Sequence, residues 1–201
     1  MANIYIENYD PAVKQARGLS TKLPVTLSGT AATLAVGGNA TVTGNLAVTG
    51  TTTFTGATNS KASVISGSGA TVTLTAAQSG SVCLFDRAAG IVYTLPAPAV
   101  GLEFDFMTTV TVTSNSYKVI TDAGTTLVAG AILGNVDNTA NKSWVGNGTT
   151  HLAVTQAAAS TNATGGIIGS WLRFTCVSAT LWEAVGMTIA GGTPSTPFAT
   201  S

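Results

Sequence analysis

The sequence predicts an all-β protein with an extended N-terminal arm, a short trimeric shaft of six-residue repeats resembling a β-helix, and a C-terminal β-sandwich or jelly-roll domain. Thr, Ala, Gly, Val and Ser dominate the chain, and β-branched residues favour strands. Short stretches of alternating apolar and polar residues are separated by Gly, Asn and Ser turns at intervals of about 8 to 12 residues. No convincing amphipathic helix of about ten residues is present.

The chain has very few charged residues. They make up 8% of its 201 residues, about a third of the roughly 25% found in an average soluble domain. A soluble chain with so few charges must cover apolar surface somewhere, and association with copies of itself is the simplest way. We therefore expect an oligomer.

Several classes of partner and location are disfavoured by the composition. Eight basic and eight acidic residues give a net charge of zero, so no basic patch is available for a phosphate backbone and we expect no nucleic-acid binding. No run of about 18 apolar residues predicts a membrane span. The first nine residues lack the basic-then-apolar order of a secretory signal, so we expect the chain to be made and to fold in the cytoplasm.

Residues 1–32 differ in composition from the rest of the chain and form the expected arm. Five of the sixteen charged residues lie in this sixth of the sequence. The pairs Asp10-Pro11 and Leu23-Pro24 favour extended joints, because proline keeps the preceding residue out of the α region. The apolar side chains here are too few for a core. The arm is therefore either disordered by itself or docked on another surface.

Residues 33–56 contain a six-residue repeat, with units that begin at Thr33, Asn39, Asn45 and Thr51. Each unit ends in glycine, which turns easily with positive φ, and its fourth position is apolar: Val36, Val42, Val48 and Phe54. Four units barely complete one coil of a single-chain β-helix, and one coil cannot bury a continuous core. Three chains side by side could bury these apolar fourth positions against one another, so the repeat predicts a homotrimeric shaft. The alternative is a flexible Gly/Thr linker.

Residues 57–70 are rich in turn-forming residues and predict a linker, after which residues 71–201 form the sandwich domain. Ser81–Phe85 and Ile91–Leu95 are expected to form a hairpin with a five-residue connection. In the next strand Phe104 and Phe106 share one face, and Glu103 and Asp105 share the other. Further strands are expected around 117–121, 126–128, 143–145, 151–156, 171–177 and 181–187.

Residues capable of chemistry form no convincing active site. His151 is the single histidine. With Cys83 and Cys176 it could supply at most three of the three or four ligands that a zinc site needs, and the spacing of these residues gives no support for such a site. These two cysteines are either buried free thiols or a disulfide, and their spacing does not decide between them. Glu103 and Asp105 are better explained as the solvated face of a strand than as a glycosidase pair. We expect no enzyme activity, no metal and no cofactor.

The three tryptophans allow two interpretations. A tryptophan in a strand of an all-β domain usually packs in a core or an interface, whereas an exposed one could stack on a sugar ring. These residues are Trp144, Trp171 and Trp182.

Two stretches resemble phage virion proteins. Residues Leu34 to Gly56 resemble the β-shaft repeats of phage fibres and head-associated proteins. Residues Leu74 to Pro98, with Gly101 to Phe106, are similar to a β domain of capsid decoration and head fibre proteins. Together they lie within residues 33–120. The resemblance implies a homotrimer on the outer capsid surface, with its N-terminal portion facing the shell.

The leading hypothesis is therefore a non-enzymatic virion protein, a homotrimeric capsid decoration (cement) or head fibre protein whose partners are its own copies and the major capsid protein. Contact with the capsid is assigned to the arm residues Ile4, Tyr5, Ile6, Tyr9, Lys14 and Arg17. The alternative is a tail fibre or receptor-binding protein that recognises a host-surface saccharide. A polysaccharide depolymerase is a third hypothesis, for which the sequence nominates no carboxylate pair.

Overall fold

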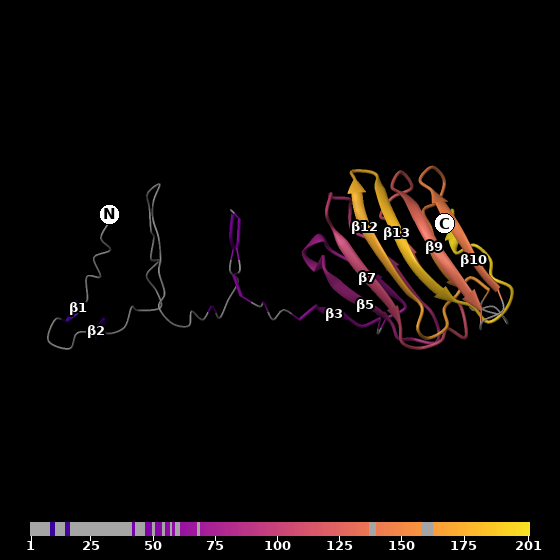
Figure 1. Ribbon diagram of the computed structural model, residues 1–201, viewed down its shortest axis with the longest axis horizontal. Helices are drawn as coiled ribbons and strands as arrows, with labels where there is room; N and C mark the ends of the chain where they lie inside the picture. The colour runs from indigo at the N-terminus through magenta and orange to yellow at the C-terminus, as the bar shows by residue number, and fades with distance from the viewer. Residues whose placement is uncertain are drawn as a thin grey trace. The chain divides into compact units, whose positions relative to one another are not determined.

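The computed structural model describes residues 9–10, 15–16, 42, 47–49, 51–53, 55–56, 58, 61–67, 69–136, 140–157 and 163–201. The chain divides into two compact units, Met1–Thr58 and Asn59–Ser201. In the first unit, β1 (Tyr9–Asp10) pairs antiparallel with β2 (Gln15–Ala16), and both are labelled in Figure 1. Among the described residues, no helix is long and apolar enough to span a membrane.

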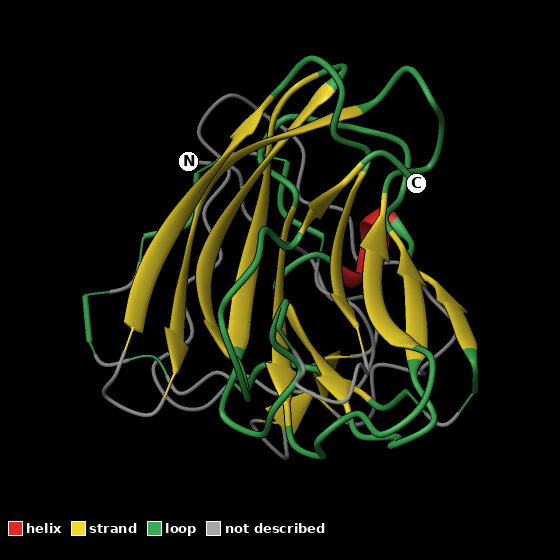
Figure 2. Cartoon of the chain, turned by 90° about the vertical axis from the view of Figure 1, so that its right-hand side faces the viewer, coloured by secondary structure: helices red, strands yellow, loops and turns green. Residues whose placement is uncertain are grey.

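The described residues of the second unit form two mixed β-sheets and one short 3-10 helix at Ala76–Gln78 (Figure 2). In the seven-stranded sheet the order is β10 (Ala140–Asn147), β9 (Leu127–Val136), β13 (Leu181–Ile189), β12 (Trp171–Ser178), β7 (Glu103–Thr108), β5 (Ser81–Phe85) and β3 (Val64–Ile65). In the five-stranded sheet the order is β14 (Phe198–Ala199), β11 (Ala153–Ala157), β8 (Ser116–Ile120), β6 (Ile91–Thr94) and β4 (Thr71–Thr73). The predicted all-β class is confirmed.

The core lies between the inner faces of the two sheets. Alternation along each strand sends every second side chain inward, and large aromatic rings occupy these positions. The ring of Phe85 on β5 lies 4.6 Å from that of Tyr117 on β8 and 5.5 Å from that of Tyr93 on β6. The ring of Phe106 on β7 lies 5.3 Å from that of Tyr93. These contacts join the two sheets face to face, so the second unit is a β-sandwich.

The expected hairpin between β5 and β6 is wrong, because the two strands lie in different sheets. β5 pairs parallel with β7, and β6 pairs parallel with β8. The connection from Asp86 to Gly90 crosses between the sheets, and Asp86 accepts hydrogen bonds from Ser66 Oγ at 2.6 Å and from the backbone N–H of Gly67 at 3.0 Å. The alternation of apolar and polar residues along a strand predicts which of its faces is buried, but it does not predict which strand lies next to it in a sheet. The parallel pairs also distinguish this sandwich from a fully antiparallel jelly roll.

Two segments outside the expected strands belong to the sandwich. Val64–Ile65, within the segment expected as a linker, form β3 and pair parallel with β5. The hydroxyl of Tyr93 donates a hydrogen bond of 2.8 Å to the Leu84 carbonyl and lies 3.3 Å from that of Ile65. At the other end of the chain, Phe198 on β14 is buried in the core of its own chain.

Candidate functional site

The outer face of the seven-stranded sheet is the part of the sandwich best suited to contact another molecule. On β7, Phe104 and Phe106 point into the core, so the intervening Glu103, Asp105 and Met107 lie on the opposite face. Residues directly opposite one another on paired strands have neighbouring side chains on the same face. The strand register therefore determines which side chains are neighbours on this outer face.

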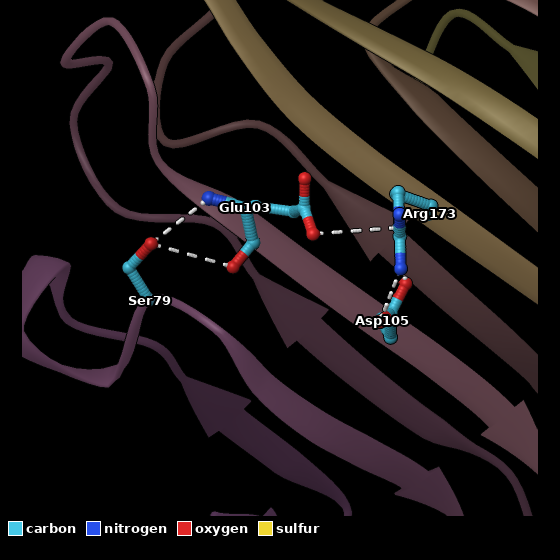
Figure 3. Close-up of polar contacts among 4 residues, drawn as sticks. All are labelled: Ser79, Glu103, Asp105 and Arg173. Carbon is cyan, nitrogen blue, oxygen red and sulfur yellow. Dashed lines mark hydrogen bonds and ion pairs between the residues drawn. The ribbon is translucent and has the colours of Figure 1, made fainter. Parts of the chain in front are cut away.

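An ion cluster occupies the β7 and β12 part of this face (Figure 3). Asp105 lies opposite Arg173 and accepts two hydrogen bonds from its guanidinium, from Nε at 2.7 Å and from Nη2 at 2.9 Å. A carboxylate oxygen of Glu103 lies 3.5 Å from the same Nε. The hydrogen bonds to Asp105, with the charges of Asp105 and Glu103, raise the pKa of Arg173. The cation is thus held in a fixed, bidentate geometry.

Ser79 links the loop before β5 to the same cluster. Its hydroxyl accepts a hydrogen bond of 3.0 Å from the backbone N–H of Glu103 and lies 3.5 Å from the carbonyl of that residue. The side chains of Arg173, Glu103 and Asp105 are between 32 and 46% exposed. An ion pair this accessible to water contributes little to stability. With one guanidinium and two carboxylates, the cluster leaves one net negative charge on this face.

Apolar side chains cover much of the remaining face. Trp171 lies between Met107 on β7 and Met187 on β13, and Met187 lies opposite Leu133 on β9. In the adjacent row, Val185 lies opposite Arg173 on one side and Ala131 on the other, and Ala131 lies opposite Val145 on β10. The large exposed members of these rows, here named the apolar patch, are Met107, Leu133, Val145, Trp171 and Val185.

A hollow of about 200 Å³ lies at one end of the apolar patch, bordered by Met107, Trp171, Arg173, Asp105 and Val82. It combines an accessible indole with a fixed cation and its carboxylate partner. Such a combination can stack on an apolar or sugar surface and hydrogen-bond at its margin. Trp171 is therefore the tryptophan available to a partner, since Trp182 is fully buried and Trp144 packs against the core.

The residues expected in the shaft are described only in part. Val42 and Val48 are 54 and 51% exposed in the single chain. Val36 and Phe54 lie outside the described residues, as do the arm residues Ile4, Tyr5, Ile6, Lys14 and Arg17. Tyr9 lies on β1, paired with Ala16. The described part of the chain thus brings none of these predicted contact residues together.

The candidate metal and redox residues have structural surroundings. His151 Nδ1 accepts a hydrogen bond of 3.2 Å from the backbone N–H of Asn147, and its ring lies 5.4 Å from Phe198. Within the described residues, no group of three metal-ligating side chains occurs. Cys83 and Cys176 are buried and free, so the disulfide alternative is wrong. Burial, with a smaller effect from Asp105, raises the pKa of the Cys83 thiol to about 12.

The sheet face was missed by sequence reasoning because its members come from five strands. One signal was present: on β12 the outward positions include Trp171 and Val177, which are as apolar as many core residues. No protein-family model, curated protein or solved structure matches the chain. The function must therefore be inferred from the repeat region and from this face.

Proposed function

We propose that the chain is a structural protein of a tailed-phage virion, a homotrimer that decorates the outer surface of the capsid. Residues 1–32 bind the major capsid protein, residues 33–56 hold the three chains together, and the sandwich projects. The protein performs no catalysis and needs no cofactor. The same architecture suits a cement protein and a head fibre.

The observation that carries the proposal is the exposure of the repeat valines. Val42 and Val48 occupy the same position of successive six-residue units, and each is more than half exposed in the single chain. Isolated apolar residues on a surface need no explanation, but an apolar residue at a fixed position in each unit does. Because only 8% of the chain is charged, burial against identical copies is the simplest way to keep it soluble.

Mass and capsid binding test the proposal together. The purified protein is expected to have three times the 20.0 kDa mass of one chain, measured by light scattering. It should also co-sediment with capsids that lack it, and a labelled antibody should locate it on the virion surface. A stable, folded monomer at micromolar concentration contradicts the proposal.

A deletion separates the roles of arm and shaft. Removing residues 1–24 should leave a soluble trimer that no longer binds capsids, because the repeats remain and the contact residues are gone. The matched control is Val42→Asp with Val48→Asp in the full chain, which should weaken the trimer while leaving the arm intact. Retained capsid binding by the deletion variant would refute the role of the arm.

A second candidate function, a receptor-binding protein for host-surface saccharide, is favoured by one observation. Trp171 is 42% exposed beside the fixed Arg173–Asp105 pair, and an accessible indole with polar groups at its edge suits a sugar ring. Binding to a glycan array, abolished by Trp171→Ala and retained by the deletion of residues 1–24, would favour this function over capsid decoration.

A further inference from the structure

The apolar patch exposes more apolar surface than scattered surface residues would. Its five members are between 37 and 73% exposed and come from β7, β12, β13, β9 and β10. With full areas of about 150 to 250 Å² for large side chains, these fractions leave roughly 500 Å² of apolar surface. A patch of this size on a single chain typically marks an interaction site.

The two rows that carry the apolar patch offer little that would select a charged partner; the carboxylate of Glu183 lies in the row beyond them. The row formed by Leu133, Met187, Trp171 and Met107 contains no ionisable group. In the neighbouring row the one cation, Arg173, is already bound by Asp105 within its own chain. These two rows offer no unpaired cation to a polyanion. To a basic surface they offer mainly methyl groups, an indole ring and thioethers. The chemistry fits another apolar surface.

A second copy of the same chain presents the same apolar patch, and within an oligomer it is always close by. About 800 Å² per partner is typical of a stable interface, so the apolar patch alone is small for association from dilute solution. Chains already joined elsewhere need less area, because tethering raises their effective concentration. On this point the inference rests on the proposed homotrimer.

We propose that the apolar patch is covered by a second copy of this chain, so that the sandwiches of one trimer contact each other through the outer faces of their seven-stranded sheets. Leu133, Val185 and Trp171 are then buried in the assembly. The ion cluster lies at the margin of the contact, where the guanidinium of Arg173 stays paired with Asp105.

The test compares two double substitutions in the full chain. Leu133→Lys with Val185→Lys places cations in the apolar patch, whereas Val100→Lys with Ile168→Lys changes residues outside the sheets that are at least as exposed. Analytical ultracentrifugation over a dilution series measures the concentration at which the trimer dissociates. The patch variant is expected to dissociate at a concentration higher by roughly a hundredfold, and the control is expected to match the wild type.

Milder substitutions guard against misfolding. Leu133→Ser with Val185→Thr removes apolar area without adding charge, and it should shift dissociation in the same direction while the circular dichroism of the sandwich stays unchanged. A wild-type trimer whose patch and control variants dissociate alike overturns this inference and leaves the proposed function standing. A monomeric wild type overturns both. Saccharide binding by that monomer, lost in Trp171→Ala, would assign the face to a glycan.

Discussion

Gly130 offers a direct test of the central sheet. It lies in β9, between β10 and the parallel neighbour β13, with φ of 113°. A Cβ atom at this position would collide with the carbonyl oxygen of Ala184 on β13. Because that neighbour is backbone, it cannot rotate away. Gly130→Ala must therefore push β9 from β13 or force a new backbone conformation.

The expected loss of stability follows from these two effects. A non-glycine residue held at positive φ costs about 1 to 3 kcal/mol. Separating the strands weakens ladder hydrogen bonds, each with a net contribution of about 1 kcal/mol. A total loss of about 3 to 5 kcal/mol is expected from the strained backbone and the weakened ladder together. For a domain of about 150 residues this lowers the melting temperature by about 10 °C or more.

The assay is urea or thermal unfolding followed by circular dichroism, with Gly124→Ala as the matched control. A Cβ atom on Gly124 meets nothing within 4 Å, so this variant should stay within about 0.5 kcal/mol of the wild type. Equal stability of the two variants would refute the close parallel pairing of β9 with β13.

Three further predictions concern single side chains in the sandwich. Arg173→Met should lower the free energy of unfolding by no more than about 1 kcal/mol, because its ion pair is largely accessible to water; denaturant titration checks this, and a loss of several kcal/mol would contradict it. Gln156→Leu should raise stability by about 1 kcal/mol, since both polar atoms of the Gln156 amide are buried and find no hydrogen-bond partner among the described residues; a clear loss in the same titration would show that the amide is satisfied. The raised pKa of Cys83 favours the protonated thiol in the folded state, so its contribution to stability is complete below pH 9 and is lost as the pH rises from about 9 towards about 12. Unfolding titrations of the wild type and Cys83→Ala over this range should show a steeper decline in the wild type, and parallel declines would contradict the assignment.

Strand positions were predictable because alternation is a local property of the sequence. The expected strand at Ser81–Phe85 has the bounds of β5, and those expected near 171–177 and 181–187 lie within β12 and β13. Pairing was not predictable, because it depends on contacts between segments far apart. Phe85 and Tyr93 looked like members of one hairpin, yet they face each other across the core from different sheets.

The candidate face was unpredictable for the same reason. Trp171 and Met107 are 64 positions apart in the sequence and become neighbours only through the register of β12 with β7. Alternation along one strand shows that two faces exist. It does not show whether the outward face is exposed to solvent or covered by another copy of the chain, because that depends on the side chains of the neighbouring strands. The charged residues Glu103 and Asp105 suggested a solvated face, while the row beside Asp105, which runs through Met107 and Trp171, is apolar.

The edges of the seven-stranded sheet favour the proposed association through its face over association through its edges. An exposed edge strand can pair with another chain and extend a sheet without limit. Here one edge strand, β3, has only two residues, and the other, β10, carries the exposed Lys142. A short strand and an edge lysine both disfavour edge-to-edge pairing. With the edges protected and the apolar patch exposed, the proposed contact between copies would bury side chains rather than add strands, which favours a small oligomer over a fibre.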